Sequence, residues 1–281
     1  MPIYDQSYRK HDARAPLRKA RFWPITREAL RLILQRRAFL VLIGVSLLPF
    51  IVRAVHIYVV IRFPEFGRVL PVDGRLFGEF LNQQIFVALL LSVFGGAGLI
   101  ANDLMTGAIL VYLSRPLTRR DYVLGKLGVL LALNLGVTLA PALALYGIGT
   151  GLAPGEYLRW ERAWIGPAIV LHGLLIATVI SLVALAVSSL SRSARISGLG
   201  FVGLFVGLEV ARGILGAMTR RPEAHILSVW NDLILVGKHL FGITDRIASV
   251  PTLYPALVLA GVVLACLAIL RSRVRAVEIV R

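Results

Sequence analysis

Three ionisable side chains, Arg53, Glu209 and Arg212, interrupt stretches of sequence that are otherwise apolar. A charged side chain at the centre of a membrane helix costs about 2.5–3.5 kcal/mol on insertion scales, so such residues usually pair or line a path. Arg53 and Glu209 lie at similar depth in two different stretches, which allows a pair between helices. Glu209 and Arg212 are spaced to pair along one helix instead, which leaves Arg53 to reach the outer headgroups. Both arrangements stay open at this stage.

Patterns for catalysis and cofactor binding are missing from the sequence. The single cysteine, Cys266, cannot form a disulfide within the chain, and the five histidines show no metal-ligand spacing. Gly125 and Lys126 are followed by Leu127 and lack an upstream glycine, so they do not form a phosphate-binding loop. We expect no catalytic residue, no cofactor and no metal site, and an intramembrane enzyme is disfavoured. If the chain does energy-dependent work, a separate ATPase must hydrolyse the nucleotide.

The apolar residues are collected into runs long enough to cross a membrane. The 281 residues are 57% hydrophobic with a mean hydropathy of +0.78, whereas soluble domains have about 45–50% apolar residues. A helix needs roughly 20 residues to span about 30 Å of hydrocarbon. Six runs meet this length, at 38–61, 83–102, 123–149, 165–190, 194–217 and 251–271. The sequence therefore predicts an all-α integral membrane protein of the cell membrane with six transmembrane helices.

Positive charge is distributed unevenly between alternate loops. Twenty Lys and Arg residues lie in one set of segments, and nine lie in the other. The first set is 1–37, 103–126, 189–195 and 271–281, and the second is 62–82, 150–164 and 218–250. Because cytoplasmic loops are enriched in Lys and Arg, we expect both termini in the cytoplasm. Topology thus explains the net charge of +16, and no nucleic-acid partner is expected.

Two segments outside the six runs have features of their own. In 25–37, one helical face carries Ile25, Ala29, Leu32 and Ile33 opposite a charged face. This predicts an interfacial helix on the cytoplasmic leaflet, and a simple charged anchor is the alternative. We divide the chain into a basic N-terminal segment, 1–37, and a six-helix membrane domain, 38–281. The outer segment 218–250 is compatible with short helices that enter the interface or with a solvated loop.

The segment from 95 to 126 combines several signals for local structure. Small residues end the second span, which we expect to terminate at Asp103. An amphipathic piece follows over 104–113 and is broken at Arg115, because a residue before proline (here Pro116) disfavours helix. Thr118 and its next three residues predict a capping box that starts the third span. A short helix, a break and a firmly capped restart form a rigid element that a partner could push.

These features resemble the type-2 ATP-binding-cassette (ABC) transport permeases over nearly the whole chain. The resemblance rests on the small residues closing the second span and on Asp103, Thr106-Gly107, Leu110 to Leu113, Ser114 to Leu117, Arg119, Tyr122 and Gly125-Lys126. Two positions depart from the family pattern. Asp103 stands where the family more often has Glu, and Gly107-Ala108 stands where it often has Gly-Thr.

The resemblance implies the permease subunit of an exporter that forms the substrate path and works by alternating access. It implies two protein partners, a cytoplasmic ABC ATPase and a second permease subunit that is identical or related. In the family, the connection between the second and third spans couples to the ATPase. That role falls here on Asp103, Gly107, Arg115, Pro116, Arg119 and Arg120. The alternative function is a membrane scaffold or assembly factor that transports nothing.

The charge distribution predicts the orientation of the chain directly. A reporter that is active only outside the cytoplasm, fused after Arg281, is expected to be inactive because the terminal segment belongs to the Lys- and Arg-rich set. The same reporter inserted in 218–250 is expected to be active and serves as the control. An active fusion after Arg281 would overturn the predicted topology.

Overall fold

The computed structural model describes residues 22–108, 118–152, 162–219, 226–243 and 251–273. The regular elements in these ranges are helices. Six helical segments are long and apolar enough to span a membrane, namely Arg37–Arg62, Gly74–Thr106, Arg119–Leu152, Ile165–Leu190, Ala194–Thr219 and Leu253–Arg273. The predicted all-α fold with six spans is therefore confirmed, and the chain is a multi-pass membrane protein.

The first and third spans each consist of two helices. The first contains α2 (Arg37–Ser46) and α3 (Leu48–Arg62), and the third contains α6 (Arg119–Val137) and α7 (Leu139–Leu152). Pro49 and Pro141 lie in the first turn of the second helix of each pair, where proline has no N–H to donate to the preceding turn. At the first break, the Gln84 side chain donates to the Ser46 carbonyl at 2.9 Å. This bond satisfies a backbone group that hydrocarbon could not.

The other four spans are single helices, α4 (Gly74–Thr106), α9 (Ile165–Leu190), α10 (Ala194–Thr219) and α12 (Leu253–Arg273). Among the described residues, three shorter helices lie outside the spans: α1 (Trp23–Leu34), the 3-10 helix η1 (Pro64–Arg68) and α11 (Val229–Leu240). Helix α4 starts at Gly74 and not at 83 as predicted. Its first turns are polar, and Asp73 caps them by accepting a hydrogen bond from the Arg75 N–H at 3.0 Å.

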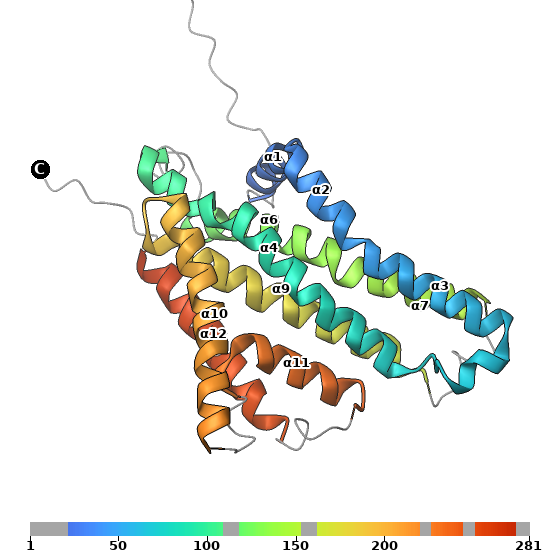
Figure 1. Cartoon of the computed structure of the whole chain (residues 1–281). Helices are drawn as coiled ribbons and strands as arrows, with labels where there is room; N and C mark the ends of the chain where they lie inside the picture. The colour runs from blue at the N-terminus through green and yellow to red at the C-terminus, as the bar shows by residue number, and fades with distance from the viewer. Residues whose placement is uncertain (1–21, 109–117, 153–161, 220–225, 244–250, 274–281) are drawn as a thin grey trace, which may run out of the picture.

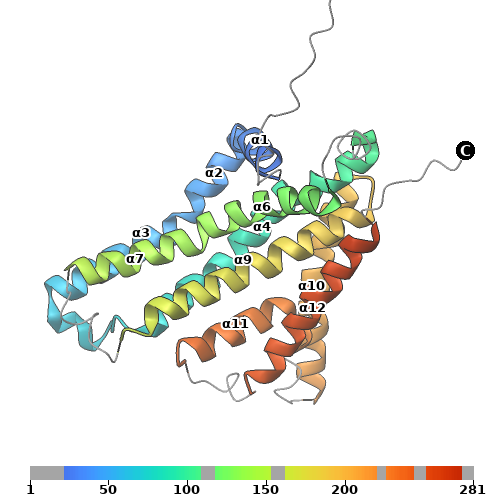
Figure 2. The ribbon, with the colours of Figure 1, turned by 180° about the vertical axis from the view of Figure 1, so that it is seen from behind.

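Helices α4 and α9 are the most deeply buried spans and form the centre of the bundle. They pack along each other, with α6 against both of them, α10 on α4 and α12 on α9. Figures 1 and 2 show α3 and α7 side by side along one edge, while α10 and α12 stand at the opposite edge. The first span and α10 bury the least surface within the chain. Their apolar faces are therefore available to lipid or to another subunit.

Buried polar side chains fasten the central helices together. Asn134 on α6 donates to the hydroxyl of Ser92 on α4 (3.0 Å) and to that of Ser181 on α9 (2.9 Å). The Ser188 hydroxyl on α9 donates to the Ala97 carbonyl of α4 at 2.8 Å. It also accepts from the Ile100 N–H of α4 at 3.1 Å. Interhelical bonds of this kind stabilise membrane bundles by about 0.6–2 kcal/mol each. They make α4, α6 and α9 one mechanical unit.

Helix α11 is short and lies at the end of the bundle opposite α1 (Figure 1). It packs against α4, α9, α10 and α12. His172 of α9 is fully buried, with its Nε2 atom 3.1 Å from the Leu233 carbonyl oxygen of α11. The rings of Phe86 on α4 and Trp230 on α11 lie 6.1 Å apart. The sequence of 218–250 is compatible with short helices or with a solvated loop. The structure contains a helix in this segment, α11, and this helix is packed against the bundle.

The contact between α11 and α9 predicts how a single methyl group changes stability. A Cβ atom added at Gly237 would overlap the His172 ring, whereas one added at Gly213 on α10 meets nothing within 4 Å. We expect Gly237→Ala to lower the free energy of unfolding by about 1–3 kcal/mol through overpacking. The control Gly213→Ala should be neutral or stabilising by up to about 1 kcal/mol. Thermal unfolding in detergent measures both, and equal stability of the two variants would contradict this packing.

Candidate functional site

The third span starts at a capping box, as the sequence predicts. The Thr118 hydroxyl oxygen accepts from the Asp121 N–H at 3.2 Å, and a carboxylate oxygen of Asp121 accepts from the Thr118 N–H at 3.1 Å. Reciprocal bonds of this kind satisfy donors that the first turn of a helix leaves open. They fix the direction in which the chain enters α6. They also place Arg119 and Arg120 on the first turn of that helix.

A buried ion pair joins the end of α4 to the start of α6. Lys126 Nζ lies 2.7 Å from Asp103 Oδ2, and the Tyr122 hydroxyl donates to the same oxygen at 2.7 Å. The side chains of Lys126 and Asp103 are only 8% and 16% exposed, and Tyr122 is fully buried. Because a buried charge without a partner is strongly destabilising, this Asp103–Tyr122–Lys126 cluster holds the two helix ends together.

Helix α4 ends at Thr106, with Gly107 as its C-cap, and not at Asp103 as predicted. Gly107 has a φ of 70°, a left-handed conformation that glycine adopts without steric cost. The Asp103 carboxylate binds the start of α6 and does not terminate its own helix, so α4 continues for another turn. The predicted break at Arg115 and Pro116 lies outside the described residues, as does the second half of the short helix predicted over 104–113.

Helix α1 lies against the start of α6. The Thr26 hydroxyl donates to the Gly125 carbonyl at 2.8 Å. Cβ atoms added at Gly125 and Gly128 would meet Ile25 and Thr26 respectively, so the two glycines allow the helices to approach closely. A helix is present where the N-terminal one was predicted, over Trp23–Leu34, and Leu32 of its predicted apolar face is 55% exposed. Its position at the cytoplasmic leaflet stays a prediction.

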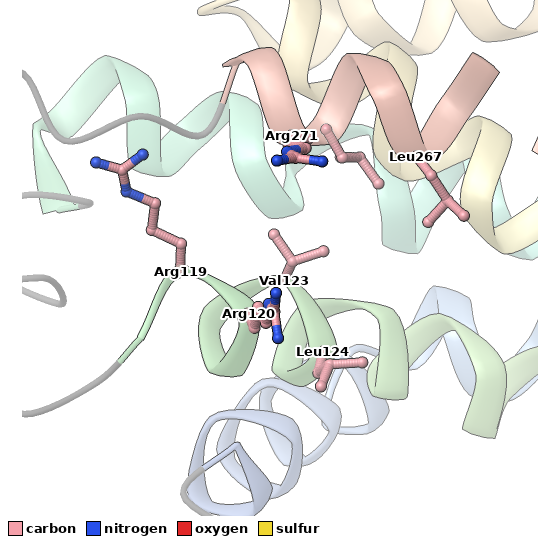
Figure 3. A pocket seen from close by; sticks show the side chains of 7 residues that line it. Arg119, Arg120, Val123, Leu124, Leu267 and Arg271 are labelled. Carbon is pink, nitrogen blue, oxygen red and sulfur yellow. The ribbon is translucent and has the colours of Figure 1, made fainter. Parts of the chain in front are cut away.

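Arg119 and Arg120 are exposed and border a groove between α6 and α12, with a volume of about 460 Å³. Figure 3 shows Arg271 on the opposing helix, with Val123 of α6 pointing toward α12. In the part of the chain that the structure describes, none of these three guanidinium groups pairs with a carboxylate. The groove is therefore bordered by three arginines that no carboxylate of the described residues compensates.

The ion pair considered between Arg53 and Glu209 does not form within the described chain. Arg53 Nη2 lies 3.3 Å from Glu79 Oε2 on α4, and the other oxygen of Glu79 accepts from Arg75 Nε at 2.7 Å. Glu209 instead accepts from Arg212 Nε at 2.9 Å along α10. The reason is packing, because α3 lies against α4 and α7, whereas α10 lies against α4 and α9. Of the sequence alternatives, the pair along α10 is the one that the structure contains.

The sequence analysis assigns no site role to three side chains that form ion pairs or hydrogen bonds in the structure. These are Tyr122 and Lys126, which bind Asp103, and Glu79, which binds Arg53 and Arg75. Lys126 lies in the apolar run of the third span, and an ionisable residue there is a functional candidate by default. The sequence does not show which carboxylate pairs with it, and the structure identifies Asp103. Glu79 falls in a loop when the second span is predicted to start at 83. Nothing in the sequence pattern indicates which oxygen the Tyr122 hydroxyl meets.

Asp232 is a further buried acid that the sequence does not single out. It lies in the first turn of α11 and is fully buried. Neither of its carboxylate oxygens has a hydrogen-bond partner among the described residues. Burial raises the pKa of Asp232 to about 8, because desolvation disfavours the charged form. The carboxyl is therefore largely protonated at neutral pH, which removes most of the cost of burying it.

Comparison with known families covers nearly the whole chain. A family model described as "ABC-2 family transporter protein" matches residues 14–270, which include α1, α11, five complete spans and all but the last three residues of α12. No curated protein matches the sequence. Within the described ranges, no group of three or more His, Cys, Asp or Glu side chains could hold a metal ion.

The Asp103–Tyr122–Lys126 cluster predicts a non-additive effect on stability. Lys126→Met leaves the Asp103 carboxylate buried without its cation, which should lower the free energy of unfolding by about 3–5 kcal/mol. The double variant Asp103→Asn, Lys126→Met should cost less than Lys126→Met alone, because no uncompensated charge remains. Arg119→Met removes an exposed cation from the same helix and should change stability by no more than about 0.5 kcal/mol. Strictly additive unfolding energies in detergent would show that the pair is not coupled.

Proposed function

Because the chain belongs to the ABC-2 family of transporter proteins and is a membrane permease of that class, we propose that it serves an exporter. In this proposal it forms the substrate path and couples to a separate cytoplasmic ABC ATPase. The observation that carries the proposal is the Asp103–Tyr122–Lys126 cluster, which fixes both ends of the connection between the second and third spans. A connection held rigidly at both ends transmits a displacement, whereas a loose loop absorbs it.

Polar contacts between helices form a continuous route from this connection to the centre of the bundle. The cluster joins α4 to α6, and Asn134 joins both helices to α9. Ser188 adds a second tie between α9 and α4 nearer the same end. ATP binding would close the two ATPases and displace the connection. The central helices would then move together and re-pack so that the path faces outward.

We assign coupling to the ATPase to the six residues implied by the family resemblance, with Asp103 acting through the buried cluster: Asp103, Gly107, Arg115, Pro116, Arg119 and Arg120. Support comes from the exposed positions of Arg119 and Arg120 on the first turn of α6. Helix α1 packs beside this turn, which supports treating 1–37 as a segment at the same membrane surface. The division from a six-helix permease domain, 38–281, belongs to the same proposal.

A second permease subunit, identical or related, would complete the path. The first span and α10 bury the least of their surface within the chain, and Gly203 and Gly207 on α10 have open space at their Cβ positions. Small residues spaced in this way suit close contact between membrane helices. Arg53, Glu209 and Arg212 lie on these same two spans, so we propose that they lie near the path.

A membrane scaffold that transports nothing is the competing function. It requires no ATPase, so the two functions differ in a simple observation. An exporter subunit should be encoded beside an ATPase gene with a phosphate-binding loop and should co-purify with its product. A chain that purifies alone and stimulates no ATP hydrolysis would favour the scaffold.

The proposed coupling surface predicts the effect of reversing its charge. Arg119→Glu with Arg120→Glu should lower transport-coupled ATP hydrolysis by about tenfold or more, because like charges at an interface cost several kcal/mol. Membrane insertion should survive. Arg192→Glu with Arg195→Glu is the control, because it reverses two exposed arginines in another loop of the Lys- and Arg-rich set. The measurement is ATPase activity and cargo export in vesicles containing the complex, and full coupling in the first double variant would refute the assignment.

A further inference from the structure

The groove between α6 and α12 has the layout of a binding site for an amphiphilic anion. Arg120 lies on the first turn of α6 and Arg271 on the last turn of α12, so both are at the end of the bundle. Leu124 and Leu267 lie one turn deeper on the same two helices and also line the groove. One turn corresponds to a depth of about 5–6 Å. The rim of the groove, at the end of the bundle, is thus positively charged, and its floor, one turn deeper, is aliphatic.

The apolar part of the groove belongs to the membrane-spanning surface. Leu124 and Leu267 are 48% and 47% exposed, so both are accessible from outside the protein. Both also lie within spanning segments. An occupant that fills the groove must therefore carry hydrocarbon as well as negative charge. An acidic side chain of a soluble partner would meet the arginines but would leave the floor uncovered.

The rim arginines select the charge of the occupant. Arg119, Arg120 and Arg271 border one groove, and within the described ranges they form no ion pair with the chain's own carboxylates. Guanidinium groups bind phosphate oxygens in a bidentate geometry. Basic pockets between membrane helices are established sites for phospholipid headgroups. A phosphodiester at the rim would pair with the arginines, and an acyl chain along the floor would cover the leucines.

We propose that the groove between α6 and α12 binds an anionic phospholipid of the surrounding leaflet, with its phosphate at Arg120 and Arg271 and an acyl chain against Leu124 and Leu267. The site requires only that the protein is embedded in a membrane. It depends neither on transport nor on an ATPase. The site shares helix α6 with Tyr122 and Lys126 of the Asp103–Tyr122–Lys126 cluster, although neither of these two buried residues lines the groove.

Native mass spectrometry of the purified full-length chain tests the proposal. The protein in detergent is titrated with phosphatidylglycerol and, separately, with phosphatidylcholine of the same acyl chains. We expect phosphatidylglycerol to bind about fivefold more tightly or better, and Arg271→Gln to remove about that factor, as expected for one arginine near a membrane surface. Phosphatidylcholine binding should be unchanged in this variant.

Arg273→Gln is the matched control, because it removes an exposed cation from the same last turn but from a side of α12 that does not line the groove. It should change phosphatidylglycerol affinity by less than about twofold, while Arg271→Lys should retain most of it. Unaltered thermal unfolding shows that each variant is folded. Equal binding of the two lipids to the unmodified chain, or equal losses in Arg271→Gln and Arg273→Gln, would overturn the proposal.

Two other occupants give different results. If the chain's own segment 274–281 fills the groove, lipid selectivity will appear only after that segment is deleted. If the groove is a protein interface, Arg271→Gln will weaken ATPase binding in a pull-down without changing lipid selectivity. Either result would overturn the proposal. Because the lipid titration contains no ATPase, its outcome is independent of whether the chain is an exporter subunit.

Discussion

A polar group placed in hydrocarbon needs a partner inside the protein, and this requirement organises most of the bundle. Helix α4 has a polar contact with each of several neighbours. Gln84 binds the broken first span, and Asn134 binds α4 and α9 from α6. Asp103 binds α6 at the helix end. Apolar packing alone would give little preference for one arrangement, because lipid tails are as apolar as the helices. These bonds set which helices are neighbours and at what depth.

The parts of the fold that depend on local sequence were predictable. The six spans follow from run length and hydropathy, because hydrocarbon imposes a minimum length on any crossing helix. The capping box at Thr118 is also local, since its partners are three residues apart. The start of α4 was not predictable from hydropathy, because Arg75 and Glu79 make its first turns polar. Those residues are stabilised by pairing with each other and with Arg53, contacts that require the neighbouring helix to be in place.

Partner choice is the part of the candidate site that sequence alone could not settle. Equal depth made Arg53 and Glu209 plausible partners, but depth does not indicate which helices are adjacent. The groove arginines show the same limit: Arg120 and Arg271 are far apart in the sequence and border one groove only because the ends of α6 and α12 lie close together. The residue types of the connection between the second and third spans were visible through the family resemblance. The role of Lys126 required the structure.

Helix α11 has a consequence for how the protein is made. Its 12 residues extend about 18 Å, well short of the roughly 30 Å that a crossing helix needs. Helix α11 is therefore too short to be inserted as a transmembrane span. It also carries the buried acid Asp232. During synthesis α11 cannot pack fully until α12, which follows it in the chain, has entered the bilayer. Only then does the surface exist against which α11 packs. The packing of α11 at the end of the bundle opposite α1 is therefore completed only after α12 has been inserted.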